Sequence, residues 1–169
     1  ALKTLLAKAA HYGADAADAI ATHGRSLSVV VREGDLEDVD NSEGRDVGLR
    51  VMVGKRQACV SSSDISDMSL DALAERAVAM ARLAPEDPYC GLAPDGLLET
   101  NAADFDLFDG SVLTPEALKM SALEVEKSTL SVKGVTQAES ASASWSTSAI
   151  HFMASNGFSS GWRTSRHDI

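Results

Sequence analysis

The sequence has little that would suit the chain to a membrane, a nucleic acid or an oxidising compartment. No apolar run approaches the length of a transmembrane helix, and the N-terminal residues lack the charged and apolar regions of a signal peptide. The two cysteines, Cys59 and Cys90, are too few and too far apart for a disulfide framework or a zinc knuckle. The net charge of -10 disfavours direct binding to a phosphate backbone. We therefore expect a cytoplasmic protein that binds neither membranes nor nucleic acid.

Metal-binding motifs are missing as well. None of the four histidines is followed by glutamate, and no two lie three to five residues apart, so no helix is predicted to clasp zinc. Residues 104–110, with Asp104 in the first position, resemble part of a calcium loop. The fifth and sixth positions hold Phe108 and Asp109, where an oxygen ligand and a glycine are required. We predict a solvated acidic loop instead, anchored to the core by its three apolar residues, Phe105, Leu107 and Phe108.

Residues 157–161 match the G-x-S-x-G pattern of the serine-hydrolase nucleophile elbow, with Ser159 in the place of the nucleophile. That elbow requires a strand, a sharp turn and then a helix, whereas this segment follows an Asn-Gly hairpin turn and precedes no helical stripe. His167 and Asp168, which follow Ser159, are adjacent and would point to opposite faces of a strand. We interpret the segment as a strand to which another segment packs closely, and His151 as a partly buried sheet residue. The sequence thus predicts no catalytic, metal-binding or cofactor-binding residue in this chain.

Alternating polar and apolar residues predict strands that are joined as hairpins. The predicted strands cover residues 26–32, 36–40, 47–53, 57–63, 140–153 and 158–169. Glycine, asparagine or aspartate stands at the turns, where a positive φ angle or a local side-chain bond is needed. Residues 14–22 suit either a strand or the tail of a helix.

Three helices are predicted from apolar residues at helical spacing. The first covers residues 2–10 and stops at Gly13. The second has Ser69 as its N-cap and ends at Pro85. The third begins with a Thr-Pro-Glu sequence at residues 114–116 and runs to about Leu130. The second helix carries one apolar stripe that should lie on a sheet: Leu70, Leu73, Ala74, Ala77, Val78 and Ala81.

The order of these elements predicts the fold class. Hairpins are followed by helices, and strands and helices do not alternate one by one along the chain. This pattern predicts an α+β fold with a largely antiparallel sheet, built from β-hairpins and carrying amphipathic helices packed on one face.

The chain resembles the TldD/PmbA family along nearly its whole length. Each motif that carries the resemblance is weak alone, but the order and spacing of all of them are specific. The segments at residues 104–108 and 165–167 are more similar to the PmbA/TldE branch than to the TldD branch. The motifs are, in order, Gly13-Ala14-Asp15-Ala16-Ala17, Leu27-Ser28-Val29, Gly34-Asp35-Leu36-Glu37, Gly48-Leu49-Arg50-Val51, Ser61-Ser62-Ser63-Asp64-Ile65-Ser66, Ala81-Arg82-Leu83-Ala84-Pro85-Glu86-Asp87-Pro88, Asp104-Phe105-Asp106-Leu107-Phe108, Asn156-Gly157-Phe158 and Ser165-Arg166-His167.

The resemblance implies an intracellular metallopeptidase assembly. In the family, a TldD-type subunit supplies the zinc site through His-Glu-x-x-x-His, which this sequence lacks, and a PmbA/TldE-type subunit completes the protease. The PmbA/TldE branch is associated with microcin maturation, antitoxin degradation and the label modulator of DNA gyrase. Because its members are more than twice as long, we expect an N-terminal fragment that is not catalytic by itself. Residues 1–130 would be its α+β domain, and residues 131–169 a hairpin segment that leads into a missing C-terminal domain.

The implied partners are a TldD-like subunit or a second copy of the chain, together with an unfolded peptide substrate. An extended peptide could add to an exposed strand edge, and the serine-rich residues 140–148 are a candidate because their short side chains leave the backbone approachable. An ordinary paired strand is the favoured interpretation of that segment. The alternative function is a non-enzymatic regulator of a toxin, an antitoxin or DNA gyrase, whose acidic surface competes for a basic patch.

Overall fold

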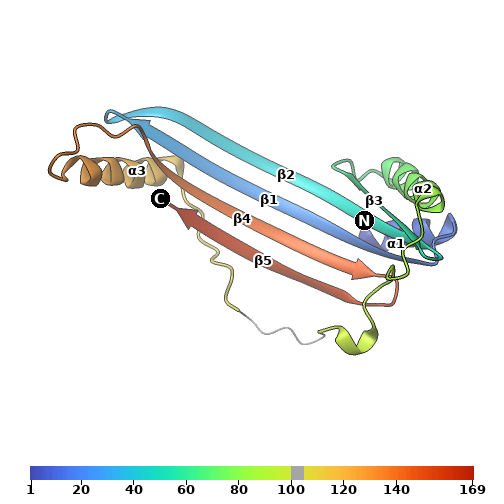
Figure 1. Cartoon of the computed structure of the whole chain (residues 1–169). Helices are drawn as coiled ribbons and strands as arrows, with labels where there is room; N and C mark the ends of the chain where they lie inside the picture. Colours follow the sequence, from blue (N-terminus) through green and yellow to red (C-terminus); the bar gives the residue numbers. More distant parts are fainter. Residues whose placement is uncertain (100–104) are drawn as a thin grey trace. The chain divides into compact units, whose positions relative to one another are not determined.

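The computed structural model describes residues 1–99 and 105–169, which form one five-stranded sheet and three α-helices (Figure 1). The elements in chain order are α1 (Leu2–His11), β1 (Ala16–Arg32), β2 (Asp35–Val53), β3 (Arg56–Ser62), α2 (Asp67–Leu83), the short 3-10 helix η1 (Asp95–Leu97), α3 (Pro115–Leu130), β4 (Ala141–Ala154) and β5 (Ser159–Asp168).

The strands are ordered β3-β2-β1-β4-β5 in an antiparallel sheet. The first three strands form a meander, and the chain then passes through α2 and α3 before β4 is added on the other side of β1 (Figure 1). β3 is short and pairs with β2 from Val47↔Ser62 to Val53↔Arg56. The predicted α+β class with an antiparallel sheet is confirmed.

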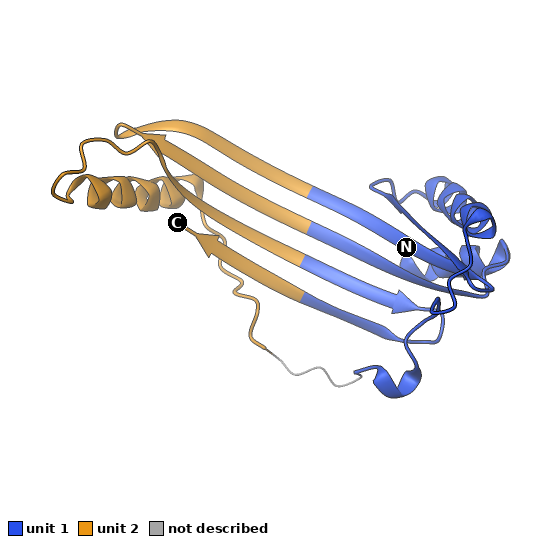
Figure 2. Ribbon diagram, viewed as in Figure 1, with its two compact units in different colours: residues 1–23, 44–104, 149–162 blue, residues 24–43, 105–148, 163–169 orange. Residues whose placement is uncertain are grey.

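The chain divides into two compact units (Figure 2). Unit 1 comprises residues 1–23, 44–104 and 149–162, and unit 2 comprises residues 24–43, 105–148 and 163–169. The predicted division after residue 130 stays a prediction. Among the described residues, no helix is long and apolar enough to cross a bilayer.

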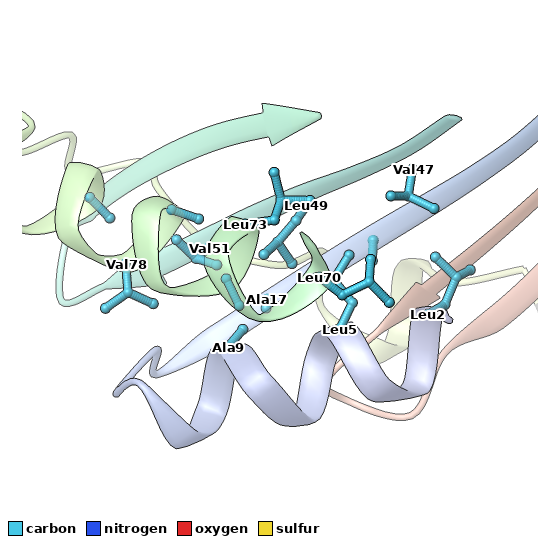
Figure 3. Packing of buried hydrophobic residues seen from close by; sticks show 14 residues of the cluster. Leu2, Leu5, Ala9, Ala17, Val47, Leu49, Val51, Leu70, Leu73 and Val78 are labelled. Carbon is cyan, nitrogen blue, oxygen red and sulfur yellow. The ribbon is translucent and has the colours of Figure 1, made fainter. Parts of the chain in front are cut away.

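The core of unit 1 lies between the helices α1 and α2 and the strands β1 and β2. In Figure 3, Leu5 of α1 and Leu70 and Leu73 of α2 gather over Leu49 and Val51 of β2. All six residues of the predicted α2 stripe are buried, which confirms that prediction. The buried members of this core are Leu2, Leu5, Ala9, Ala17, Ala19, Val47, Leu49, Val51, Leu70, Leu73, Ala74, Ala77, Val78 and Ala81.

The core of unit 2 lies between α3 and the strands β1 and β4. Its members are Leu27, Val29, Val31, Leu118, Ala122, Ala141, Ala143 and Trp145. Thr114 caps α3 by accepting a hydrogen bond from the Ala117 N–H, and Pro115 occupies the first turn. The predicted start and end of this helix are therefore confirmed, because Pro115–Leu130 is the observed span.

Local backbone chemistry sets the ends of α1 and α2. Gly13 follows α1 with φ +97°, and the Gly13 and Ala14 N–H groups donate to the carbonyls of Ala10 and Ala9, the pattern of a Schellman motif. At α2 the prediction of Ser69 as the cap is wrong. The cap is Ser66, whose hydroxyl accepts from the Ser69 N–H at 3.3 Å, so the helix begins one turn earlier than the apolar stripe indicates.

The strands β1 and β2 are much longer than the sequence predicts. Residues 14–22, which suited a strand or a helix tail, belong mainly to β1. Residues 41–46 are exposed members of β2, so they carry no apolar alternation for a prediction to detect. The predicted hairpin turn between the two strands is confirmed at Glu33 and Gly34, which both have positive φ angles.

Candidate functional site

The β4–β5 hairpin brings a serine and a histidine together. Ser159 Oγ lies 3.2 Å from His151 Nε2, an arrangement that a nucleophile and its base also show. Both side chains are exposed, so the prediction that His151 is partly buried is wrong. The partner of Ser159 is thus a residue earlier in the chain and not His167.

Gly161 explains why the two residues meet. A Cβ atom on Gly161 would lie 2.7 Å from His151 Nδ1 and 2.8 Å from the Ile150 carbonyl oxygen, so only glycine lets the imidazole approach the neighbouring strand. The predicted close packing at this segment is confirmed. A serine triad also needs a carboxylate on the histidine. Within residues 1–99 and 105–169, no hydrogen bond joins His151 to a carboxylate, so the pair lacks the third member of a triad.

In the acidic loop after residue 104, an aspartate side chain forms hydrogen bonds within the loop itself. The Asp109 carboxylate accepts hydrogen bonds from the Ser111 N–H and hydroxyl, each at 2.9 Å, and these bonds lower the pKa of Asp109. Asp104 lies outside the described residues. In the described part of the chain, no group of three or more histidine, cysteine, aspartate or glutamate side chains could hold a metal ion. That the chain lacks a metal site stays a prediction.

The same loop is attached to β5 by its backbone. The Leu107 carbonyl accepts from the Ser165 N–H at 2.9 Å, and the Asp109 N–H donates to Ser165 Oγ at 2.8 Å. The Arg163 guanidinium lies 3.5 Å above the centre of the Phe108 ring. The prediction that apolar side chains anchor the loop is wrong for Phe105 and Leu107, which are 71% and 50% exposed.

The serine-rich segment of residues 140–148 is not a sheet edge. Its residues 141–148 belong to β4, which has β1 on one side and β5 on the other. β4 is therefore an interior strand in the order of the sheet, although β5, with 10 residues, is shorter than β4, with 14. The favoured interpretation, an ordinary paired strand, is confirmed.

A charged pair lies on β1 and β2 in unit 1. The Arg50 Nε atom donates to both carboxylate oxygens of Asp18, at 3.2 and 3.0 Å, and Nη2 donates to Oδ2. Asp18 is one of two buried polar residues in the described chain, and its hydrogen bond raises the pKa of Arg50. Cys59 lies opposite Arg50 in the β2–β3 register. The pair satisfies a buried carboxylate and forms no open site by itself.

The sequence reasoning missed one exposed feature, the part of β2 that extends beyond β3. Residues 35–42 lie outside the segment that β3 covers, Val47–Val53, and every one of them is exposed. The signal was present, because this stretch contains four acidic residues and no lysine or arginine. The sequence predicted residues 36–40 as a short separate strand, so it did not indicate that they belong to a long strand with one uncovered edge.

The chain matches known proteins in both sequence and fold. Residues 17–81 match the family described as PmbA/TldA metallopeptidase domain 1. The chain is 29% identical over 157 residues to the metalloprotease PmbA of Escherichia coli O157:H7, an alignment that covers 92% of this chain and 35% of that protein. It is 27% identical over 114 residues to the metalloprotease PmbA homolog of Haemophilus influenzae, covering 68% of this chain and 25% of that protein.

Two solved structures show the same fold. A protein named as a modulator of DNA gyrase from Bacteroides thetaiotaomicron has a TM-score of 0.85 at 17% identity, covering 98% of this chain and 38% of its own. TldE from Thermococcus kodakarensis has a TM-score of 0.77 at 16% identity, covering 96% of this chain and 36% of its own. The chain therefore spans between 25% and 38% of these relatives' lengths. In its N-terminal region, at residues 17–81, this chain is thus similar to domain 1 of the PmbA/TldD family.

Proposed function

We propose that this chain is the N-terminal part of a PmbA/TldE-type subunit of a zinc metallopeptidase that cleaves unfolded peptides in the cytoplasm. The subunit acts with a TldD-type partner, which holds the zinc ion, and takes part in microcin maturation and antitoxin degradation. This chain forms a scaffold and performs no bond cleavage by itself. A homo-oligomer of the whole protein is the other assembly that would fit.

The observation that carries the proposal is the match of residues 17–81 to a metallopeptidase domain 1. The similarity to the metalloprotease PmbA of Escherichia coli O157:H7, which extends over 35% of that protein, also supports a metallopeptidase subunit. The described residues also contain no group that could hold a metal ion, which fits a division of labour between subunits. The chemistry of the zinc ion, activation of a water molecule for attack on a peptide carbonyl, would come from the partner.

The test uses the full-length protein that contains this chain. It is mixed with a purified TldD-type subunit and incubated with fluorescently labelled casein, with and without a chelator. We expect the mixture to degrade casein, each subunit alone to be inactive, and the chelator to abolish degradation until zinc is returned. A stable mixture of the two subunits that leaves casein intact would overturn the peptidase proposal.

One observation favours the alternative, a non-enzymatic regulator. The structure from Bacteroides thetaiotaomicron belongs to a protein named as a modulator of DNA gyrase, and the net charge of -10 suits a competitor for a basic patch on such a partner. The discriminating measurement is gyrase supercoiling activity with the full-length protein alone. Inhibition at stoichiometric concentration, together with inert casein in the mixture above, would favour the regulator.

A further inference from the structure

We propose that residues 35–42 of β2 form a docking edge that binds an extended, basic segment of a partner protein by strand addition. The proposal goes beyond the proposed function, because it requires neither zinc nor peptide cleavage. It also concerns another strand than the serine-rich candidate segment, residues 140–148, most of which lies in the interior strand β4.

The first argument is the open backbone of this edge. β2 has β1 on one side, and β3 covers the other side only from Val47 to Val53. Across residues 35–42, no strand of the described chain lies on that outer side. Every second residue of a strand directs its N–H and C=O groups to one side. The outer row is therefore available to another chain, as in complexes formed by strand addition.

The second argument is charge. Asp35, Glu37, Asp38 and Asp40 give this stretch four negative charges and no positive one. Among the described residues, only Glu37 of these four is held in an ion pair, with Arg32 at 3.5 Å. A strand with lysine or arginine at alternate positions would place its charges on one face, against Asp38 and Asp40, which share a face of β2. Each exposed pair contributes only about 0.2–1 kcal/mol, but several such pairs select a basic partner over an acidic one.

Two exposed apolar side chains supply contact area. Leu36 and Val39 are 48% and 43% exposed, and they are an odd number of positions apart, so they lie on opposite faces of the strand. An added strand would bury part of each side chain against its own alternate residues. The favoured ligand therefore combines basic residues with β-branched ones.

The third argument is preorganisation at the start of the strand. The buried Glu126 of α3 accepts a hydrogen bond from the Gly34 N–H, 2.9 Å from Oε2. This bond fixes the hairpin turn that directly precedes Asp35. A strand that is already ordered loses less conformational entropy when it binds a ligand.

The other edge of unit 2 shows a different solution. There, the chain's own residues Leu107 and Asp109 form hydrogen bonds with Ser165 of β5. Acidic residues on an uncovered edge can also serve only to prevent pairing with another sheet. A docking edge should bind a basic extended peptide, whereas an edge that is only protected should not.

The test measures binding of a labelled peptide to the whole chain by fluorescence anisotropy. The probe is an acetylated peptide of alternating lysine and valine residues. Two control peptides are used, one with glutamate in place of lysine and one with every backbone nitrogen methylated. Methylation keeps the charge but removes the hydrogen-bond donors of both edges. We expect the lysine peptide to bind, and both controls to bind on the order of tenfold more weakly or not at all.

Variants locate the binding site. The triple substitution Asp35→Asn, Asp38→Asn and Asp40→Asn should weaken binding on the order of tenfold. The matched control Glu116→Gln, Glu124→Gln and Glu139→Gln removes the same charge from exposed residues of unit 2 and should leave binding unchanged. Both variants must keep the circular dichroism spectrum and melting temperature of the parent.

Three outcomes would overturn the proposal. The first is the absence of binding at millimolar peptide, which together with self-association of the triple variant would leave the acids as edge protection only. The second is equal binding of the methylated peptide, which would reduce the interaction to charge attraction. The third is equal weakening by both triple variants, which would assign it to the net charge of the chain.

Discussion

The guanidinium of Arg50 on β2 donates hydrogen bonds from two of its nitrogens to the carboxylate of Asp18 on β1, and the Asp18 side chain is only 9% exposed. Replacing Arg50 alone leaves a desolvated charge without a partner, a change that costs about 3–5 kcal/mol in fully buried pairs. Because the Arg50 side chain is 37% exposed, we expect Arg50→Met to lower the free energy of unfolding by about 2–3 kcal/mol. Urea unfolding followed by circular dichroism measures this loss.

The double variant Asp18→Leu with Arg50→Met provides the control for that prediction. Removing both charges together should restore most of the lost stability, since the apolar pair needs no desolvation. A double variant as unstable as the sum of Arg50→Met and Asp18→Leu would show that the two residues do not act as a pair.

Gly13 predicts a backbone effect at the end of α1. Its φ angle is +97°, and a Cβ atom there would lie 2.8 Å from Arg82 Nη2, which donates to the Tyr12 carbonyl. We expect Gly13→Ala to lower the unfolding free energy by about 1–2 kcal/mol. The matched control is Gly91→Ala, at a residue with no atom within 4 Å of the added Cβ and no positive φ angle. Equal effects in thermal melts of the two variants would contradict this account.

The two cores allow one cavity test each. Leu5 in unit 1 and Leu118 in unit 2 are both completely buried. Leu5→Ala and Leu118→Ala should each cost about 2–5 kcal/mol, measured by chemical unfolding. Leu83, at 88% exposure, supplies the control, since Leu83→Ala should change stability by less than about 0.5 kcal/mol. If Leu118→Ala behaved like the control, the packing of α3 on β1 and β4 would be wrong.

Asp71 on α2 predicts how stability depends on pH. Lys8 Nζ lies 2.8 Å from its Oδ1 and the Tyr12 hydroxyl donates to Oδ2 at 2.7 Å. The Lys8 and then the Tyr12 hydrogen bond lower the pKa of Asp71, and the bond to Asp71 raises the pKa of Tyr12. The Asp71 contribution is therefore present above the unfolded pKa of about 4 and is lost as pH falls through the lower folded value. The Tyr12 contribution is present below the unfolded pKa of about 10 and is lost as pH rises through the higher folded value.

The measurement is the difference in unfolding free energy between the parent chain and Asp71→Asn across pH. We expect a plateau from about pH 5 to about pH 9 and a smaller difference on both sides. The variant Asp38→Asn removes the same charge from an exposed strand position and should give no such plateau. A difference that does not change with pH would show that the contacts of Asp71 do not alter its titration.

Local signals in the sequence predicted the elements that local chemistry decides. The α2 stripe, the Thr114 cap and the hairpin turns depend on neighbours within a few residues, and the structure confirms all of them. The wrong prediction of the α2 cap also concerns residues only three positions apart. Ser66 and Ser69 are both able to cap a helix, and the bond from the Ser69 N–H to the Ser66 hydroxyl decides between them.

Features that depend on residues far apart in the chain could not be predicted from the sequence. Residues 41–46 belong to β2 because β1 lies beside them, although their exposed side chains carry no alternation. Phe105 and Leu107 have apolar side chains, yet the backbone bonds to Ser165 hold their loop in place. The His151–Ser159 pair requires a hairpin register and Gly161. Each of these depends on pairing between strands, which a single sequence does not encode as a periodic pattern.

The place of β4 beside β1 has a consequence for synthesis on the ribosome. β1 ends at Arg32, whereas β4 begins at Ala141, after α2 and α3 have been made. At translation rates of about 5–20 residues per second, β4 is made on the order of ten seconds after β1, so β1 lacks its second neighbouring strand during that time. During that interval a nascent chain halted before residue 141 should be captured by a holding chaperone, and one in which β5 has also been made should escape it. Completion of the five-stranded sheet is then the event that ends the need of this region for protection.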